Sequence, residues 1–307
     1  MAEIILVHGI GQEHKSADTV ESEYLPNLAG GVRLAGYPEC ADRIWRAGRP
    51  GDDIARVAFY GDFFRRADQQ GDDADLVGLT SEQAALAEEL LIEWTQRYAE
   101  RATDPGDREH AERALQYVRG DLADRQGLLA GLRPVLRFLS RTRPLAKLGE
   151  TFAGRVLRTA IVQVSRYLTE DELRARIQQR VSEHIGPDTK VLIGHSLGSV
   201  VAFEAAHRIA TPLPTLITLG SPLGLRNIVY DRVRPQPPSV PALVQRWINV
   251  ADRDDLVAAD LNLDRRFAGA EGVLRSTYLV DNGAHPHDAG FYLTTAIVGD
   301  AVGSAFQ

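Results

Sequence analysis

The chain has 307 residues, 44% hydrophobic and 25% charged, proportions typical of a globular protein with a sizeable core. Its formal net charge of −7 argues against nucleic-acid binding, because no overall positive field would attract phosphates. A single cysteine, Cys40, excludes internal disulfide bonds and a cysteine-based zinc cluster, and we interpret it as a small apolar core residue.

The N-terminal segment reads MAEIILVHGIG and lacks the basic region, the long apolar stretch and the cleavage site of a signal peptide. No window reaches about 18 uninterrupted apolar residues, so no transmembrane helix is predicted. We therefore expect a cytoplasmic protein.

Short apolar runs bounded by turn residues predict six strands: Ile4–Val7, Ala55–Tyr60, Lys190–Ile193, Thr215–Leu219, Val244–Val250 and Val273–Val280. Several runs are continuously apolar, which is typical of a parallel sheet buried on both faces. Helices are expected at Ala17–Ala35, Glu170–His184, Leu197–Ile209 and Gly290–Ala305. The alternation of strands and helices predicts a single α/β domain with a mostly parallel sheet of about six strands flanked by helices.

The middle of the chain departs from this alternation. From about residue 64 to 168 there is no good strand pattern, only helical periodicity. One apolar helical face is formed by Leu128, Leu129, Leu132, Val135, Leu136 and Leu139. We expect a large all-helical insertion, a candidate lid, placed before the strand at residues 190–193.

The pentapeptide Gly194-His195-Ser196-Leu197-Gly198 falls between a predicted strand and a predicted helix. On such a sharp turn a serine oxygen projects above the sheet, where it can act as a nucleophile. Gly194 and Gly198 suit this turn, because a Cβ at either position would collide with neighbouring backbone. Ser196 is the candidate nucleophile.

A serine nucleophile needs a base, and the base needs a group that orients it. In this architecture the acid follows first in the chain and the histidine last, each after a strand. The loop after residues 244–250 offers four aspartates; we favour Asp255, with Asp252 second and Asp254 and Asp260 as the others. The loop after residues 273–280 offers His287, which we favour, and His285.

An oxyanion hole would complete the site. One donor is the backbone N–H of Leu197, and the other should come from the loop after the first strand, His8-Gly9-Ile10-Gly11. We expect Ile10 to supply it, with Gly9 and Gly11 shaping the loop. His8 is expected to support the loop by hydrogen bonding.

The order His8-Gly9-x-Gly11, Gly194-x-Ser196-x-Gly198, Asp255, His287 resembles the α/β-hydrolase superfamily. The stretch TLGSPLG, residues 218–224, is similar to the Gly-Ser-Pro segment of its lipase-type members. The chain departs from the pattern in two ways: the superfamily's first two strands are absent, and the insertion precedes the nucleophile. The resemblance implies a lipase-like or esterase-like serine hydrolase.

These residues predict hydrolysis of a carboxylic ester, which can be a lipid ester, without a metal or other cofactor. Thioesters and peptides react through similar intermediates, and an acyltransferase or a serine peptidase would use the same three side chains. A non-catalytic interaction protein on a hydrolase scaffold is the alternative from a different class. The partner expected in every catalytic case is a small-molecule or lipid substrate, not a nucleic acid.

Residues 126–168 carry eight basic side chains and one acidic residue, Glu150, a net charge of +7 in an otherwise acidic chain. The basic residues are Arg133, Arg137, Arg141, Arg143, Lys147, Arg155, Arg158 and Arg166. Such a stretch can lie on an anionic membrane or cover an acyl-chain site. In the alternative interpretation, its apolar face packs on the core and its arginines pair with the acidic remainder.

The membrane hypothesis predicts that the protein sediments with anionic vesicles but not with neutral ones, because attraction to anionic lipid adds to apolar burial. Vesicle sedimentation measures this directly. Equal binding to both kinds of vesicle, or binding to neither, would rule out the membrane role.

Overall fold

The computed structural model describes residues 2–46, 54–65, 78–102, 104–121, 137–139, 150–258 and 260–307. The chain divides into two compact units. Unit 1 combines Met1–Arg65 with Glu172–Gln307, and unit 2 is Arg66–Asp171.

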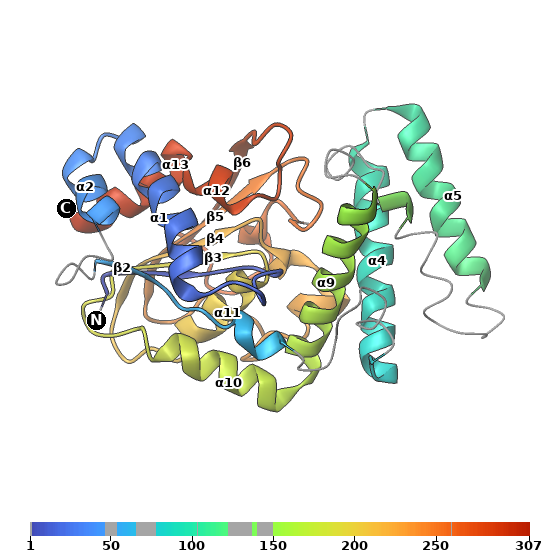
Figure 1. The fold of residues 1–307 in the computed structure, drawn as a ribbon, viewed down its shortest axis with the longest axis horizontal. Coiled ribbons are helices and arrows are strands. Elements are labelled where there is room, and N and C mark those ends of the chain that lie inside the picture. Colours follow the sequence, from blue (N-terminus) through green and yellow to red (C-terminus); the bar gives the residue numbers. More distant parts are fainter. Residues whose placement is uncertain are drawn as a thin grey trace. The chain divides into compact units, whose positions relative to one another are not determined.

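Within the described residues, unit 1 contains one six-stranded sheet in which every neighbouring pair is parallel (Figure 1). The strands are β1 (Ile4–Val7), β2 (Ala55–Val57), β3 (Val191–His195), β4 (Leu213–Leu219), β5 (Val244–Asp252) and β6 (Leu274–Val280). Their spatial order is β2-β1-β3-β4-β5-β6. The prediction of a parallel sheet of about six strands in an α/β architecture is confirmed.

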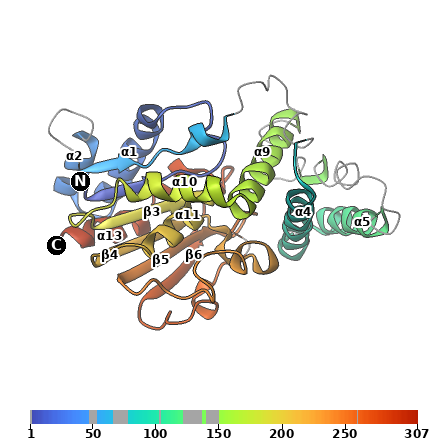
Figure 2. The same ribbon diagram turned by 90° about the horizontal axis from the view of Figure 1, so that it is seen from below.

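Helices cover both faces of this sheet. On one face lie α1 (Ala17–Leu34), α2 (Pro38–Arg46), α12 (Ala289–Leu293) and α13 (Ala296–Gly303), above the sheet in Figure 1. On the other face lie α10 (Asp171–Ser182) and α11 (Leu197–Ala206), which are in front of the strands when the molecule is seen from below in Figure 2.

The core of unit 1 extends to both sides of the sheet. Ile4 and Leu6 of β1 belong to the cluster packed against α1 and α13, whereas Ile5 and Val7 alternate to the other face. All four β1 side chains are buried, and every residue of α11 is buried as well. This two-sided burial explains why the strands are continuously apolar in sequence.

Two helices differ from the sequence-based expectation. The last helix, expected to be continuous, is interrupted between α12 and α13, because the Thr295 side chain accepts the Val298 N–H and starts a new helix. Helix α2 was not predicted. It starts at Pro38, which tolerates a first helical position, and it buries Ile44 in the core together with Cys40.

Unit 2 is described by its helices α4 (Ser81–Arg101), α5 (Pro105–Asp121) and α9 (Glu150–Thr169). A capping box joins Thr80 to Gln83 at the start of α4, and the Gln83 side chain also donates to Thr169 and Glu170. No helix of the described residues is long and apolar enough to cross a membrane.

The stretch expected to be a helical insertion, residues 64–168, overlaps in sequence with almost all of unit 2, residues 66–171. Its predicted apolar face at 128–136, together with Arg133, Arg141, Arg143 and Lys147, lies outside the described residues. The lid and membrane roles of the basic segment stay predictions.

A buried ion pair joins α10 to α11. Arg174 Nε donates to Glu204 Oε2 at 2.9 Å, a second guanidinium nitrogen bonds the same carboxylate, and both side chains are almost completely buried. The Arg234 N–H also donates to Glu204, at 3.0 Å. We expect Glu204→Ala to lower the free energy of unfolding by about 3–5 kcal/mol, because the buried Arg174 charge loses the carboxylate that it pairs with.

Urea denaturation measures this loss. Asp42→Ala is the matched control, since it breaks the exposed Arg33–Asp42 pair and should cost at most about 1 kcal/mol. Equal losses in the two variants would contradict the assignment of the buried pair as a main stabilising contact.

Candidate active site

The connections of the sheet diverge at β1. The chain passes from β1 to β2 on one side of the sheet and later enters β3 on the other side of β1. Ligands of open parallel sheets bind at the carboxyl ends of the strands at such a switch point. Val7 and Gly194 pair at this end, so the segments 8–11 and 195–198 follow neighbouring strands to the same edge.

Ser196 occupies the sharp turn between β3 and α11. Its φ of 54° makes it the only non-glycine residue with a positive φ in the described part of the chain, with ψ at −129°. A Cβ on Gly198 would lie 2.3 Å from the carbonyl oxygens of Val7 and His8, and one on Gly194 would lie 2.4 Å from the Gly198 carbonyl. Only glycine fits at both positions.

Three side chains form a hydrogen-bonded series at this turn. Ser196 Oγ lies 3.0 Å from His287 Nε2, and His287 Nδ1 lies 2.8 Å from Asp255 Oδ2. An ionised carboxylate can only accept a hydrogen bond, so His287 Nδ1 carries the imidazole proton and donates it to Asp255. His287 Nε2 can then accept a hydrogen bond from the Ser196 hydroxyl. The Asp255 side chain is fully buried, and the His287 side chain is 29% exposed.

The structure separates Asp255 from the other candidate acids. Asp252 accepts the N–H groups of Asp254 and Asn282 at 2.7 and 2.6 Å, and so fastens the end of β5 to the loop that follows β6. Asp260 pairs with Arg266. Of the four aspartates that sequence considered, only Asp255 is hydrogen-bonded to His287.

The two late histidines are also separated. His285 stacks on Phe291 with ring centroids 5.0 Å apart, whereas His287 reaches both Ser196 and Asp255. Both preferred residues of the sequence analysis, Asp255 and His287, therefore lie with Ser196.

The pKa values of the two buried aspartates, Asp255 and Asp252, are shifted in opposite directions. Burial would raise the pKa of the Asp255 carboxyl, but the charge of His287 and the hydrogen bonds from His287 and Tyr292 bring it below its usual value. For Asp252, burial prevails over its hydrogen bonds to Asn282 and Asp254 and raises the pKa. Asp255 is thus the carboxyl held in its charged form beside the imidazole.

The loop after β1 lies against the Ser196 turn. A Cβ on Gly9 would come within 2.8 Å of Ser196 Cβ, and Gly11 ends the loop with a φ of 74°. For the backbone N–H groups of Ile10 and Leu197, the structure records no acceptor within the described residues.

His8 connects this loop to the residues after β2. The Tyr60 N–H donates to His8 Nε2 at 3.0 Å, the Tyr60 hydroxyl donates to the His8 carbonyl at 2.6 Å, and the two rings stack 4.1 Å apart. Since Nε2 accepts, His8 is neutral with its proton on Nδ1, which bonds the Gly9 carbonyl. These bonds hold the loop after β1 against the segment after β2.

Three supporting residues were missed by the sequence analysis. Tyr292 donates its hydroxyl to Asp255 Oδ2 at 2.8 Å, and His195 Nε2 lies 3.0 Å from the His287 carbonyl. Gly220 has a φ of 52°, and a Cβ there would lie 2.6 Å from Asp255 Oδ2. His195 and Gly220 stood in motifs that sequence had singled out, but nothing in the sequence marked Tyr292.

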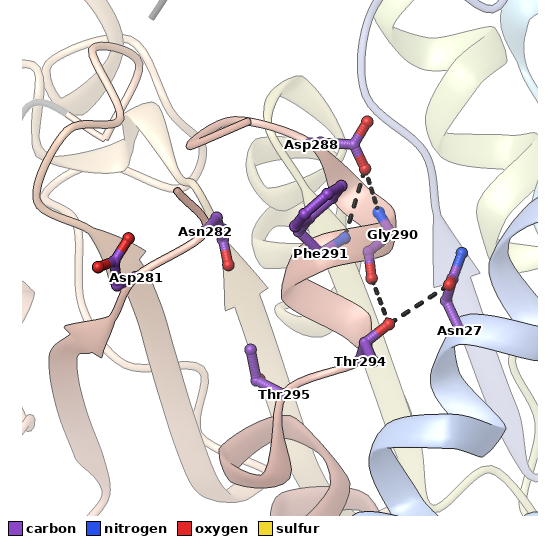
Figure 3. Close-up of a pocket in the computed structure, with 8 residues that line it drawn as sticks. All are labelled: Asn27, Asp281, Asn282, Asp288, Gly290, Phe291, Thr294 and Thr295. Carbon is purple, nitrogen blue, oxygen red and sulfur yellow. Dashed lines mark hydrogen bonds between the residues drawn. The ribbon is translucent and has the colours of Figure 1, made fainter. Parts of the chain in front are cut away.

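Helix α12, which carries Tyr292, is fixed in place by its neighbours (Figure 3). Asp288 Oδ1 accepts the N–H groups of Gly290 and Phe291, and Thr294 Oγ1 bonds Asn27 of α1. A surface groove of about 420 Å³ runs beside this helix, lined by Asn27, Asp281, Asn282, Asp288, Gly290, Phe291, Thr294 and Thr295. None of the three series residues lines the groove.

Among the described residues there is no group of three or more His, Cys, Asp or Glu side chains that could hold a metal ion. Comparisons with protein-family models, with curated proteins and with solved structures found no match.

Two buried histidines make the free energy of unfolding depend on pH. Burial lowers the pKa of His8 to about 4, and burial together with the neighbouring His287 lowers the pKa of His195 to about 3. The unfolded chain binds these protons near pH 6.5, so stability is full above that value and is lost as the pH falls toward 4 and 3. Each histidine steepens the decline by up to about 1.4 kcal/mol per pH unit.

We therefore expect His195→Asn to flatten the decline in unfolding free energy between pH 6.5 and 5. Urea denaturation at several pH values measures the slope. His14→Asn, at an exposed position, is the control and should leave the slope unchanged. An unchanged slope in His195→Asn would mean that this histidine titrates alike in folded and unfolded protein.

Proposed function

We propose that this protein is a serine hydrolase of carboxylic esters, of the α/β-hydrolase type. The observation that carries the proposal is the series Ser196–His287–Asp255, with bonds of 3.0 and 2.8 Å, at the switch point of the sheet. A serine hydroxyl bonded to an imidazole that a buried carboxylate orients is the arrangement that activates a serine nucleophile.

In the proposed reaction, Ser196 Oγ attacks the acyl carbonyl while His287 Nε2 takes its proton. Asp255 keeps the imidazole oriented and stabilises the imidazolium that forms. The N–H groups of Ile10 and Leu197 hold the developing oxyanion, and the latter belongs to the N-terminus of α11, where negative charge is favoured. His287 then protonates the leaving alcohol.

The second half of the reaction uses the same groups. His287 takes a proton from water, the water oxygen attacks the acyl-enzyme carbonyl, and the proton returns to Ser196 as the acid leaves. The loop after β1 keeps its place near the oxyanion through the contacts of His8 with Tyr60. The reactants of this half-reaction are the acyl-enzyme and one water molecule.

The fold supports the superfamily assignment. Ser196 follows β3, Asp255 follows β5 and His287 follows β6, so all three come from carboxyl ends of parallel strands. Their chain order of serine, acid and histidine is the order of α/β-hydrolases, as is a strained serine between a strand and a helix. The strained φ of Ser196 supports a functional role, because such backbone persists where its surroundings enforce it.

The first test is covalent labelling with a fluorophosphonate, which reacts with a serine activated in this way. We expect the wild type to be labelled and Ser196→Ala to lose all labelling. Ser22→Ala is the control, since Ser22 is exposed on α1 and should leave labelling unchanged. Lack of labelling of the folded wild type, with or without lipid vesicles, would contradict the proposal.

Ester hydrolysis gives the complementary measurement. His287→Ala and Asp255→Asn should each lower kcat for a short-chain aryl ester by about 10³- to 10⁴-fold, because the base or its orientation is lost. Asp252→Asn should retain far more activity than Asp255→Asn, since Asp252 does not contact His287 through its hydrogen bonds. Equal losses in the two aspartate variants would contradict the assignment of the acid.

A further inference from the structure

Tyr292 is completely buried between the two acidic residues that sequence could not separate. Its hydroxyl lies 2.8 Å from Asp255 Oδ2 and 2.8 Å from the backbone nitrogen of Asp252. It thus meets both the carboxylate of the series and the backbone at the end of β5.

The direction of these two bonds is determined by their partners. The Asp252 N–H can only donate, so the hydroxyl oxygen accepts there, and the single hydroxyl proton goes to Asp255 Oδ2. Burial and the adjacent Asp255 raise the pKa of Tyr292, which keeps the hydroxyl protonated. Tyr292 is therefore a permanent donor to the carboxylate.

The Asp255 carboxylate is held on both of its oxygens. Oδ1 accepts the backbone N–H groups of Val257 and Ala258 at 2.9 and 3.4 Å, and Oδ2 is shared by Tyr292 and His287. Gly220 packs directly against this carboxylate, because even a methyl group there would come within 2.6 Å of Oδ2. Tyr292 and His287 thus meet at the same carboxylate oxygen.

We propose that Tyr292 is a positioning residue that places Asp255, and not Asp252, opposite His287 and limits how strongly the carboxylate holds the imidazolium. The inference rests on the proposed function for its catalytic meaning. By sharing Oδ2, the hydroxyl withdraws part of the negative charge that would otherwise face His287. By accepting the Asp252 N–H, it fixes the loop on which Asp255 lies.

The titratable groups around this point are few among the described residues. Asp255 is faced by His287, Tyr292, His195 and Asp252, and Tyr292 is faced by both aspartates. His195 stays neutral above about pH 3, so it adds no change of charge in the range where an esterase is assayed. Because the Asp255 carboxylate bonds both Tyr292 and His287, a shift in the titration of His287 after a change at Tyr292 reports first on Asp255.

Tyr292→Phe removes only the hydroxyl. We expect the second-order rate of fluorophosphonate labelling to fall about 10- to 100-fold, the range that loss of a hydrogen bond to a charged group supports. We also expect the acidic limb of the labelling rate, plotted against pH, to move to higher pH. Without the tyrosine hydroxyl, the Asp255 carboxylate holds the His287 imidazolium more strongly. Tyr37→Phe, which removes a tyrosine–aspartate bond to Asp300 at 3.1 Å, should change neither quantity.

A second variant keeps the ring and the hydroxyl in place, in case Tyr292→Phe folds poorly. Site-specific replacement of Tyr292 by 3,5-difluorotyrosine gives a stronger donor, and it should move the same limb to lower pH. A slower rate with an unmoved limb in both variants would show that Tyr292 only packs, and would overturn the inference.

An NMR titration of the His287 ring separates this inference from the proposed function, because it requires no turnover. A wild type that is never labelled would refute the hydrolase proposal. In that case a shift of the His287 titration to higher pH in Tyr292→Phe still supports the positioning role, and an unshifted titration overturns it.

Discussion

The close packing of the Ser196 turn against the end of β1 is the constraint on which the candidate site depends. The backbone of β1 comes so near to α11 that a single methyl group on Gly198 would overlap two carbonyl oxygens. This approach forces the chain to turn sharply after β3 and leaves Ser196 at a φ of 54°. Such a conformation costs roughly 1–3 kcal/mol, which the surrounding structure must offset.

The buried sheet supplies that compensation. β3 lies between β1 and β4, is buried along its whole length, and is followed by a helix that is buried throughout. A turn between two such elements cannot relax without exposing apolar surface or breaking strand pairs. The strained backbone is therefore maintained, and it leaves Ser196 Oγ 3.0 Å from His287 Nε2.

His287 and Asp255 are positioned by a network that extends past the three residues of the series. His195, within the serine turn, bonds the backbone of His287, and Asp252 ties the end of β5 to Asn282 in the same late loop. Tyr292 then bonds Asp255 from α12. Each loop is thus held by the others, which suits the proposed reaction, because the site must then keep its geometry while charge moves.

Sequence alone determined the strands and the place of Ser196. Apolar runs bounded by turn residues are local patterns, and a Gly-x-Ser-x-Gly turn between a strand and a helix is local as well. The pentapeptide together with its flanking strand and helix was therefore enough to single out the serine. The six strands overlap the predicted runs, although the second ends at Val57 and not at Tyr60.

Only the tertiary structure decided which histidine bonds Ser196 and which aspartate bonds that histidine. These contacts join residues 32 and 91 positions apart, so they depend on strand order and register, which no local pattern contains. Sequence could not single out Tyr292 for the same reason, because its contact with Asp255 exists only in the folded chain. The interruption between α12 and α13, which follows from capping by Thr295, likewise became clear only in the folded chain.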